Sequence, residues 1–139
     1  MVGRRAEPVY NDNGRAHRAW PGGGIVAVWG PKGAPGRSTV ATALAGALAG
    51  AARVVLVDAD LQGGALRLRL GADMGGNVAS ACLFPTLAGA PCAPDHLWAH
   101  RAGFTLLSGV PGPAYDVTVE PAALVALLER LRWAFDVVV

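Results

Sequence analysis

The chain has 139 residues, of which 53% are hydrophobic and 16% are charged. This composition suits one small domain with a core and excludes intrinsic disorder over most of the length. The net charge of +2 comes from arginines within residues 1–22, and the remainder is neutral, which argues against a broad basic surface for nucleic acid. Two cysteines, Cys82 and Cys92, do not make a disulfide scaffold, and residues 1–24 contain no apolar signal segment. We therefore expect a cytoplasmic protein, with no membrane span and no nucleic-acid surface in this part of the chain.

The beginning of the chain separates into a leader and a folded part. Residues 1–23 have no hydrophobic period and close on a proline followed by glycines, which is typical of a flexible leader. Residues 24–139 are expected to form the folded domain. Its first element is the short apolar run 25–29, which predicts a buried strand. A loop rich in glycine and proline follows at 30–36, and residues 38–50 predict a helix that begins with two hydroxyl side chains.

The rest of the chain alternates buried strands with helices. Strands are predicted at 53–58, at 104–108 and from Asp136 onward, and helices at 65–70, 77–83, 95–101 and 121–133. Continuous apolar strands alternating with helices predict an α/β fold, in which a parallel sheet carries helices on both faces in three layers. Because the sequence stops within the fourth strand, we expect the N-terminal part of a larger domain, truncated after that strand.

The loop between the first strand and the first helix has the context of a phosphate-binding loop. Glycines let backbone N–H groups approach phosphate oxygens, and the positive end of the helix dipole points at the same place. The pattern G-x-x-x-x-G-K-[ST] is met in part, because Pro31 replaces the first glycine and Arg37 replaces the lysine, whereas Gly36 and Ser38 are kept. A dinucleotide-binding turn is the competing interpretation, but its G-x-G-x-x-G pattern is absent from this loop.

A second motif, Asp58-Ala59-Asp60-Leu61-Gln62-Gly63, follows the second predicted strand. Its two carboxylates leave the carboxyl end of a parallel strand, where open α/β sheets bind their ligands. One carboxylate can hold the water shell of a metal ion while the other orients an attacking water. The alternative is a loop whose acids are solvated or cap a helix. The phosphate-type loop beside it favours the functional interpretation, with a nucleoside triphosphate as ligand.

Together the two motifs resemble the ParA/MinD superfamily of deviant Walker-type P-loop ATPases. The family pattern K-G-G-x-G-K-[ST]-T corresponds to Lys32 through Thr39, and D-x-D-x-Q-G corresponds to Asp58 through Gly63. The variant of the loop in this chain is most similar to the CpaE-like and septum-site-determining branch found in actinobacteria. The resemblance covers about residues 25–139.

The resemblance implies a homodimer that closes around ATP and Mg²⁺. Lys32 would reach the partner's phosphates and Asp60 would position water, so these two are the expected catalytic residues. Ser38 and Asp58 would hold Mg²⁺, and Thr39 would lie beside the α-phosphate. The family's next acidic residue would fall beyond the end of this sequence. The residues expected to bind the nucleotide are Gly33, Ala34, Pro35, Gly36, Arg37, Ser38 and Thr39.

The cellular role that the resemblance implies is that of an ATP-dependent positional switch. Its partners would be proteins of the division, pilus or secretion machinery, and its task would be septum placement, localisation of such an apparatus or chromosome partitioning. Because arginine is longer than lysine and planar, Arg37 leaves the activity open between a weak ATPase and no hydrolysis. The alternative function is therefore a hydrolysis-deficient scaffold of the same fold that acts as a protein-interaction platform.

Two weaker signals complete the sequence-based expectations. Cys92, His96 and His100 recur every four residues, so a helix would place them on one face, but no fourth zinc ligand is evident and a surface helix is favoured. Two tryptophans, Trp29 and Trp133, are expected to pack in the interior.

Overall fold

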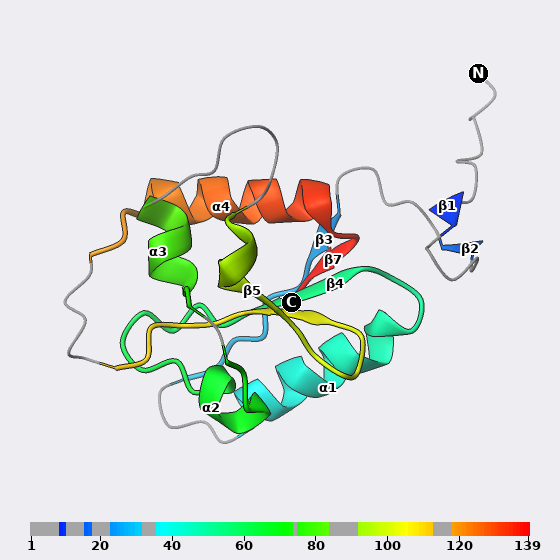
Figure 1. The fold of residues 1–139 in the computed structure, drawn as a ribbon, viewed down its shortest axis with the longest axis horizontal. Helices are drawn as coiled ribbons and strands as arrows, with labels where there is room; N and C mark the ends of the chain where they lie inside the picture. Colours follow the sequence, from blue (N-terminus) through cyan, green and yellow to red (C-terminus); the bar gives the residue numbers. More distant parts are fainter. Residues whose placement is uncertain are drawn as a thin grey trace.

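The computed structural model of the protein describes residues 9–10, 16–17, 23–31, 36–73, 75–83, 92–112 and 118–139. A five-stranded sheet in the order β3-β7-β4-β6-β5 lies at its centre (Figure 1). The first four of these strands run parallel to one another, and β5 is antiparallel to β6. The strands are β3 (Gly24–Ile25), β4 (Val54–Val57), β5 (Leu97–Ala99), β6 (Thr105–Leu107) and β7 (Val137–Val138).

Helices cover both faces of this sheet, which confirms the predicted α/β class and its three layers. Figure 1 shows α1 and α2 on one face and α3 and α4 on the other. A single turn of 3-10 helix, η1, precedes β5. The helices are α1 (Arg37–Ala49), α2 (Leu66–Leu70), α3 (Val78–Leu83), η1 (Pro94–His96) and α4 (Pro121–Ala134).

Strand β4 divides the core into two halves, because side chains of a strand alternate between the faces of the sheet. Val54 and Leu56 pack with Ala45 of α1 on one face. Val55 packs with Leu127 of α4 on the other face. All five side chains are buried, so the near-continuous apolar run of β4 is explained by a sheet that is covered on both sides.

The first strand is shorter than predicted. The run 25–29 was expected to be one buried strand, but β3 ends at Ile25, and the last bond to β7 is donated by the Val26 N–H to the Val138 carbonyl oxygen at 2.8 Å. Beyond that point Trp29 is 85% exposed, and Trp133 on the outer face of α4 is 76% exposed. The expectation that both tryptophans pack in the interior is therefore wrong for the described part of the chain.

Residues 95–101, predicted as helical turns, form η1 and then an edge strand. Trp98 pairs with Leu106 across a tight turn that contains Gly103 at φ 92°. The sheet consequently has five strands, where the sequence predicted four. Cys92 precedes η1, His96 lies within it and His100 follows β5, so no helix face gathers the three. Within the described residues, no cluster of three or more His, Cys, Asp or Glu side chains could hold a metal ion.

Four residues of the predicted leader form a two-stranded sheet of their own. Here β1 (Val9–Tyr10) pairs antiparallel with β2 (Ala16–His17), which the sequence did not predict. The proposed boundary between residues 23 and 24 stays a prediction. Across the described helices, none combines the length and the apolar character required to cross a bilayer.

Candidate functional site

The first turn of α1 presents unpaired backbone donors at the carboxyl edge of the sheet. Gly36 precedes this helix with φ 106°, a left-handed conformation that residues with a Cβ rarely adopt, so glycine is required there. The first helical hydrogen bond runs from the Val40 N–H to the Gly36 carbonyl oxygen at 2.7 Å. In the described chain, no side chain caps this end and no acid occupies its first turn. The N–H groups of the turn therefore remain available to an anion.

Three of the predicted nucleotide-binding residues lie in this turn, namely Arg37, Ser38 and Thr39. The Arg37 guanidinium donates a hydrogen bond to the carbonyl oxygen of Gly30 at 3.0 Å, from the helix back to the start of the loop. This contact holds a cationic group against the loop at the position where the phosphate-loop pattern has lysine. Residues 32–35, with the predicted Lys32, Gly33, Ala34 and Pro35, lie outside the described residues.

Asp58 leaves the end of β4 and is tied into the loop that follows. Its carboxylate accepts hydrogen bonds from the N–H groups of Leu66 at 3.1 Å and Asp60 at 3.3 Å. The first of these bonds links the carboxylate to the first residue of α2. Burial raises the pKa of the Asp58 carboxyl above its ordinary value of 3.8, and the two N–H donors act in the opposite direction. A partly buried carboxylate of this kind gains from a nearby cation.

Asp60 is exposed and folds back onto its own loop. One of its oxygens accepts from the N–H groups of Gln62 at 2.9 Å and Gly63 at 3.0 Å. Such local bonds are typical of aspartate in turns. In this structure both acids of the motif are thus engaged by backbone donors, and each keeps acceptor positions for water or a metal ion.

A second loop, after β6, holds the acidic loop in place, and no role was predicted for it. The Gly64 N–H donates to the Val110 carbonyl oxygen at 2.8 Å, and the Val110 N–H donates to the Asp60 carbonyl oxygen at 3.2 Å. A Cβ on Gly109 would lie 2.9 Å from the Asp58 Cγ and 2.8 Å from the Asp60 carbonyl oxygen. Glycine at 109 is therefore needed for close approach. The sequence feature that could have indicated this loop is the concentration of Gly and Pro after the third predicted strand, at residues 109–113.

The topology brings the two predicted motifs to one edge of the sheet. The loop after β3 and the loop after β4 both leave the carboxyl ends of parallel strands, and only β7 separates these strands. By contrast, Asp136 begins β7 at the amino edge, where it accepts from the Arg53 backbone N–H at 2.8 Å and from its guanidinium at 3.0 Å. That carboxylate is structural, since its partner stands at the start of β4.

The residues at the carboxyl edge fit a nucleotide with Mg²⁺. The uncapped helix turn offers N–H donors for phosphate oxygens, Ser38 offers a hydroxyl, and Asp58 offers a partly desolvated carboxylate.

Comparison of the sequence with protein-family models and with curated proteins finds no significant match. Solved structures do match. The cobyrinic acid a,c-diamide synthase from Mycobacterium smegmatis, solved with ADP and magnesium, shares 28% identity at a TM-score of 0.66, covering 84% of this chain and 49% of that one. The septum site-determining protein MinD from Pyrococcus horikoshii OT3, solved with Mg-ADP, shares 20% identity at a TM-score of 0.58, covering 83% and 46%.

The cell division ATPase MinD from Pyrococcus furiosus gives a TM-score of 0.57 at 20% identity, with coverage of 84% and 48%. The chain thus has the fold of ParA/MinD-like P-loop ATPases and spans about half the length of the structures that it matches.

Proposed function

We propose that the chain is the N-terminal, nucleotide-binding part of an ATP-dependent positional switch. The observation that carries this proposal is the arrangement at the carboxyl edge, where an uncapped first turn of α1 and the Asp58 loop flank the same end of the sheet. The magnesium nucleotides in the matched structures support ATP and Mg²⁺ as ligands.

The proposed roles of Arg37, Ser38 and Asp58 follow from their chemistry, and those of Asp60 and Lys32 rest on the resemblance to ParA/MinD ATPases. The N–H groups of the α1 turn bind phosphate oxygens, and Arg37 contributes a fixed positive charge beside them. The Ser38 hydroxyl and the Asp58 carboxylate would hold Mg²⁺, which would neutralise phosphate charge. Asp60 would orient water, and Lys32 would reach the phosphates bound by a second protomer. Association of two copies would depend on the nucleotide that these residues bind.

Partners are proposed from the resemblance alone. The switch would act with proteins of the division, pilus or secretion machinery, or in chromosome partitioning. Placement of the septum is one form of this task, and a cytoplasmic location is consistent with it.

A second candidate function is a scaffold of the same fold that binds partners without hydrolysing ATP. The contact that favours it is the hydrogen bond from Arg37 to Gly30, because a guanidinium held by a loop carbonyl is less free than an ammonium to follow the γ-phosphate. The two candidates agree on the fold and differ in the need for nucleotide.

Sedimentation velocity of the intact protein separates the two functions. With Mg²⁺ and a non-hydrolysable ATP analogue, the switch predicts a shift from monomer to dimer, which Lys32→Ala abolishes. A sedimentation coefficient that is unaffected by nucleotide in the folded protein would refute the switch and favour the scaffold. Release of phosphate by the parent and by Arg37→Lys then measures how far the arginine slows hydrolysis.

A further inference from the structure

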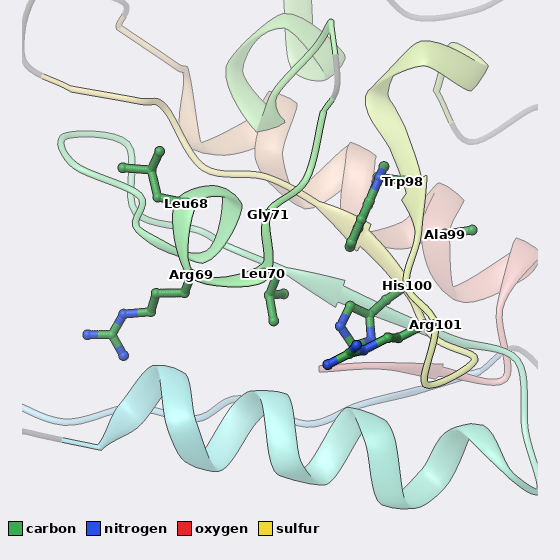
Figure 2. A pocket seen from close by; sticks show the side chains of 8 residues that line it. All are labelled: Leu68, Arg69, Leu70, Gly71, Trp98, Ala99, His100 and Arg101. Atoms are coloured by element: carbon green, nitrogen blue, oxygen red, sulfur yellow. The ribbon is translucent and has the colours of Figure 1, made fainter.

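A cavity of about 890 Å³ lies away from the nucleotide edge, between the end of α2 and the end of β5 (Figure 2). Its volume falls in the range of sites that hold a small ligand or a short peptide segment. The cavity is lined by Leu68, Arg69, Leu70, Gly71, Trp98, Ala99, His100 and Arg101.

The cavity runs along the edge of the sheet. β5 is the last strand in the order β3-β7-β4-β6-β5, so one side of it has no neighbouring strand in the described chain. Four consecutive residues, 98–101, line the cavity. Of these, Trp98 and Ala99 belong to β5, whereas His100 and Arg101 belong to the turn that follows it, so the cavity lies beside the last residues of the edge strand. An extended ligand at this place would run beside β5.

The backbone of β5 offers hydrogen-bonding groups to such a ligand. The His100 N–H donates to the Phe104 carbonyl oxygen at 2.8 Å, which marks this pair as hydrogen-bonded. Since hydrogen-bonded pairs alternate in an antiparallel ladder, Trp98 is bonded to β6 and the N–H and C=O of Ala99 point outward. Ala99 lines the cavity and is exposed. The neighbouring outward N–H, that of Leu97, already donates to Pro94 within the chain.

The side chains around this edge are rich in donors and lack carboxylates. Arg69, His100 and Arg101 line the cavity with no acidic residue among them. Neither arginine forms an ion pair within the part of the chain that the structure describes. The Nδ1 atom of His100 accepts from the Ala102 N–H at 3.1 Å, so the proton of the neutral ring resides on Nε2, which is a donor. The charge of the cavity therefore selects an anionic ligand.

The positions of the two arginines favour an elongated ligand. Figure 2 shows Arg69 and Arg101 on opposite sides of Leu70, with the Arg69 side chain extending away from Arg101. Leu70 and Trp98 add apolar surface to the cavity, and both pack partly against the core beside α1.

The wall on the β5 side is held in place before any ligand arrives. The His100 ring is stacked on Phe104 with ring centroids 4.4 Å apart, and its centroid is 5.5 Å from that of Trp98. Phe104 is buried in the core. This aromatic row fixes both rings without the ligand, which lowers the entropy lost on binding.

From these observations we infer that the cavity is a docking site for an acidic, extended peptide segment of a partner protein. The segment pairs with the outward groups of Ala99 as an added strand, its carboxylates meet Arg69 and Arg101, and an apolar side chain between them contacts Trp98. This inference goes beyond the proposed nucleotide site and uses none of its residues.

The test is a selection from random heptapeptides displayed on phage, using the intact protein. The parent should enrich sequences with acids on both sides of an apolar residue, and the double variant Arg69→Gln/Arg101→Gln should not. A synthetic copy of an enriched peptide should shift the backbone amide signal of Ala99 and the indole N–H signal of Trp98 in NMR spectra. N-methylation of its central backbone amides should weaken binding at least about tenfold, because strand pairing depends on them.

Matched variants identify the charges involved. Arg69→Gln or Arg101→Gln alone should lower the affinity at least about fivefold, and high salt should lower it further. Arg67→Gln is the control, because this arginine belongs to the same helix but does not line the cavity, and it should leave the affinity within about twofold. Amide spectra of every variant check that the fold is intact.

Three results would overturn the inference. One is enrichment of the same peptides by the double variant, and another is enrichment of neutral sequences. The third is binding of citrate at Ala99 and Trp98 as tightly as any selected peptide, which would make the cavity a site for small anions. Each of these results is independent of nucleotide binding, so failure here leaves the proposed switch untouched.

Discussion

Gly109→Ala tests whether the loop after β6 holds the acidic loop by close packing. The added Cβ would stand 2.8 Å from the Asp60 carbonyl oxygen, 2.9 Å from the Asp58 Cγ and 2.9 Å from the Gly64 Cα. Ordinary contacts of a Cβ begin at about 3.4 Å, so three neighbours must move by roughly half an ångström. Two of them are backbone atoms, which cannot turn aside as a flexible side chain can.

Overpacking of this kind costs about 1–3 kcal/mol. The midpoint of thermal unfolding should fall by about 2–8 °C for each kcal/mol in a domain near this size. The displaced Asp58 should also weaken binding of ATP in the presence of Mg²⁺. Urea unfolding followed by circular dichroism measures the free energy of unfolding, and calorimetry measures the nucleotide affinity.

Gly63→Ala is the matched control for this experiment. It lies in the same acidic loop, and a Cβ there would meet nothing within 4 Å. Its free energy of unfolding should stay within about 0.5 kcal/mol of the parent. Equal stability of Gly109→Ala and Gly63→Ala would refute the close packing between the two loops.

The remaining predictions concern single groups. Burial raises the pKa of Asp58 above 3.8, so its contribution to stability is complete below pH 3.8 and is lost as the pH rises through the folded pKa. In urea titrations, the free energy of unfolding of Asp58→Asn relative to the parent should therefore increase as the pH is raised above 3.8, and a decrease would contradict the assignment. Burial raises the pKa of the Cys92 thiol to about 11, so only ~0.1% of it is thiolate at pH 8. Labelling of Cys92 by a disulfide reagent should therefore require unfolding. Fast labelling of the native protein would show that the thiol is accessible. Asn77 caps α3, because its Oδ1 accepts from the Ala79 and Ser80 N–H groups at 3.0 and 3.1 Å. Asn77→Ala should lower the free energy of unfolding by about 1 kcal/mol. An unchanged unfolding midpoint would show that the cap does not stabilise the protein.

Periodicity predicted the elements of the fold that are longest and most regular. The helix expected at 121–133 is α4, and its Leu127 and Leu131 side chains are buried in the core. The apolar run ending at Asp58 is β4, buried on both faces. These two predictions were correct because a helix with one apolar face, or a strand with an uninterrupted apolar run, is usually buried.

The elements that were missed depend on contacts distant in sequence or on turns. Strand β5 has three residues, 97–99, which are too few to show a hydrophobic period. They form a strand because the turn at Gly103 brings β6 alongside them. The exposure of Trp29 depends on where pairing with β7 ends, and no local pattern shows this.

The candidate site was predictable as two motifs, whereas its supports were not. Ser38 and Asp58 were named from strand–loop–helix context, and the fold brings their loops to one edge. Three supports of the site require coordinates: the contact of Arg37 with Gly30, the hydrogen bond from the Leu66 N–H to Asp58, and the close approach of Gly109. The roles assigned to Lys32 and Asp60 in catalysis stay predictions.

The most direct test of the account is titration of the intact protein with ATP by calorimetry, with and without Mg²⁺. We predict a micromolar dissociation constant, which corresponds to roughly −8 kcal/mol. Its dependence on Mg²⁺ should be lost in Ser38→Ala, while Gly63→Ala should bind as the parent does. The absence of binding heat at several temperatures in the folded protein would contradict the nucleotide site.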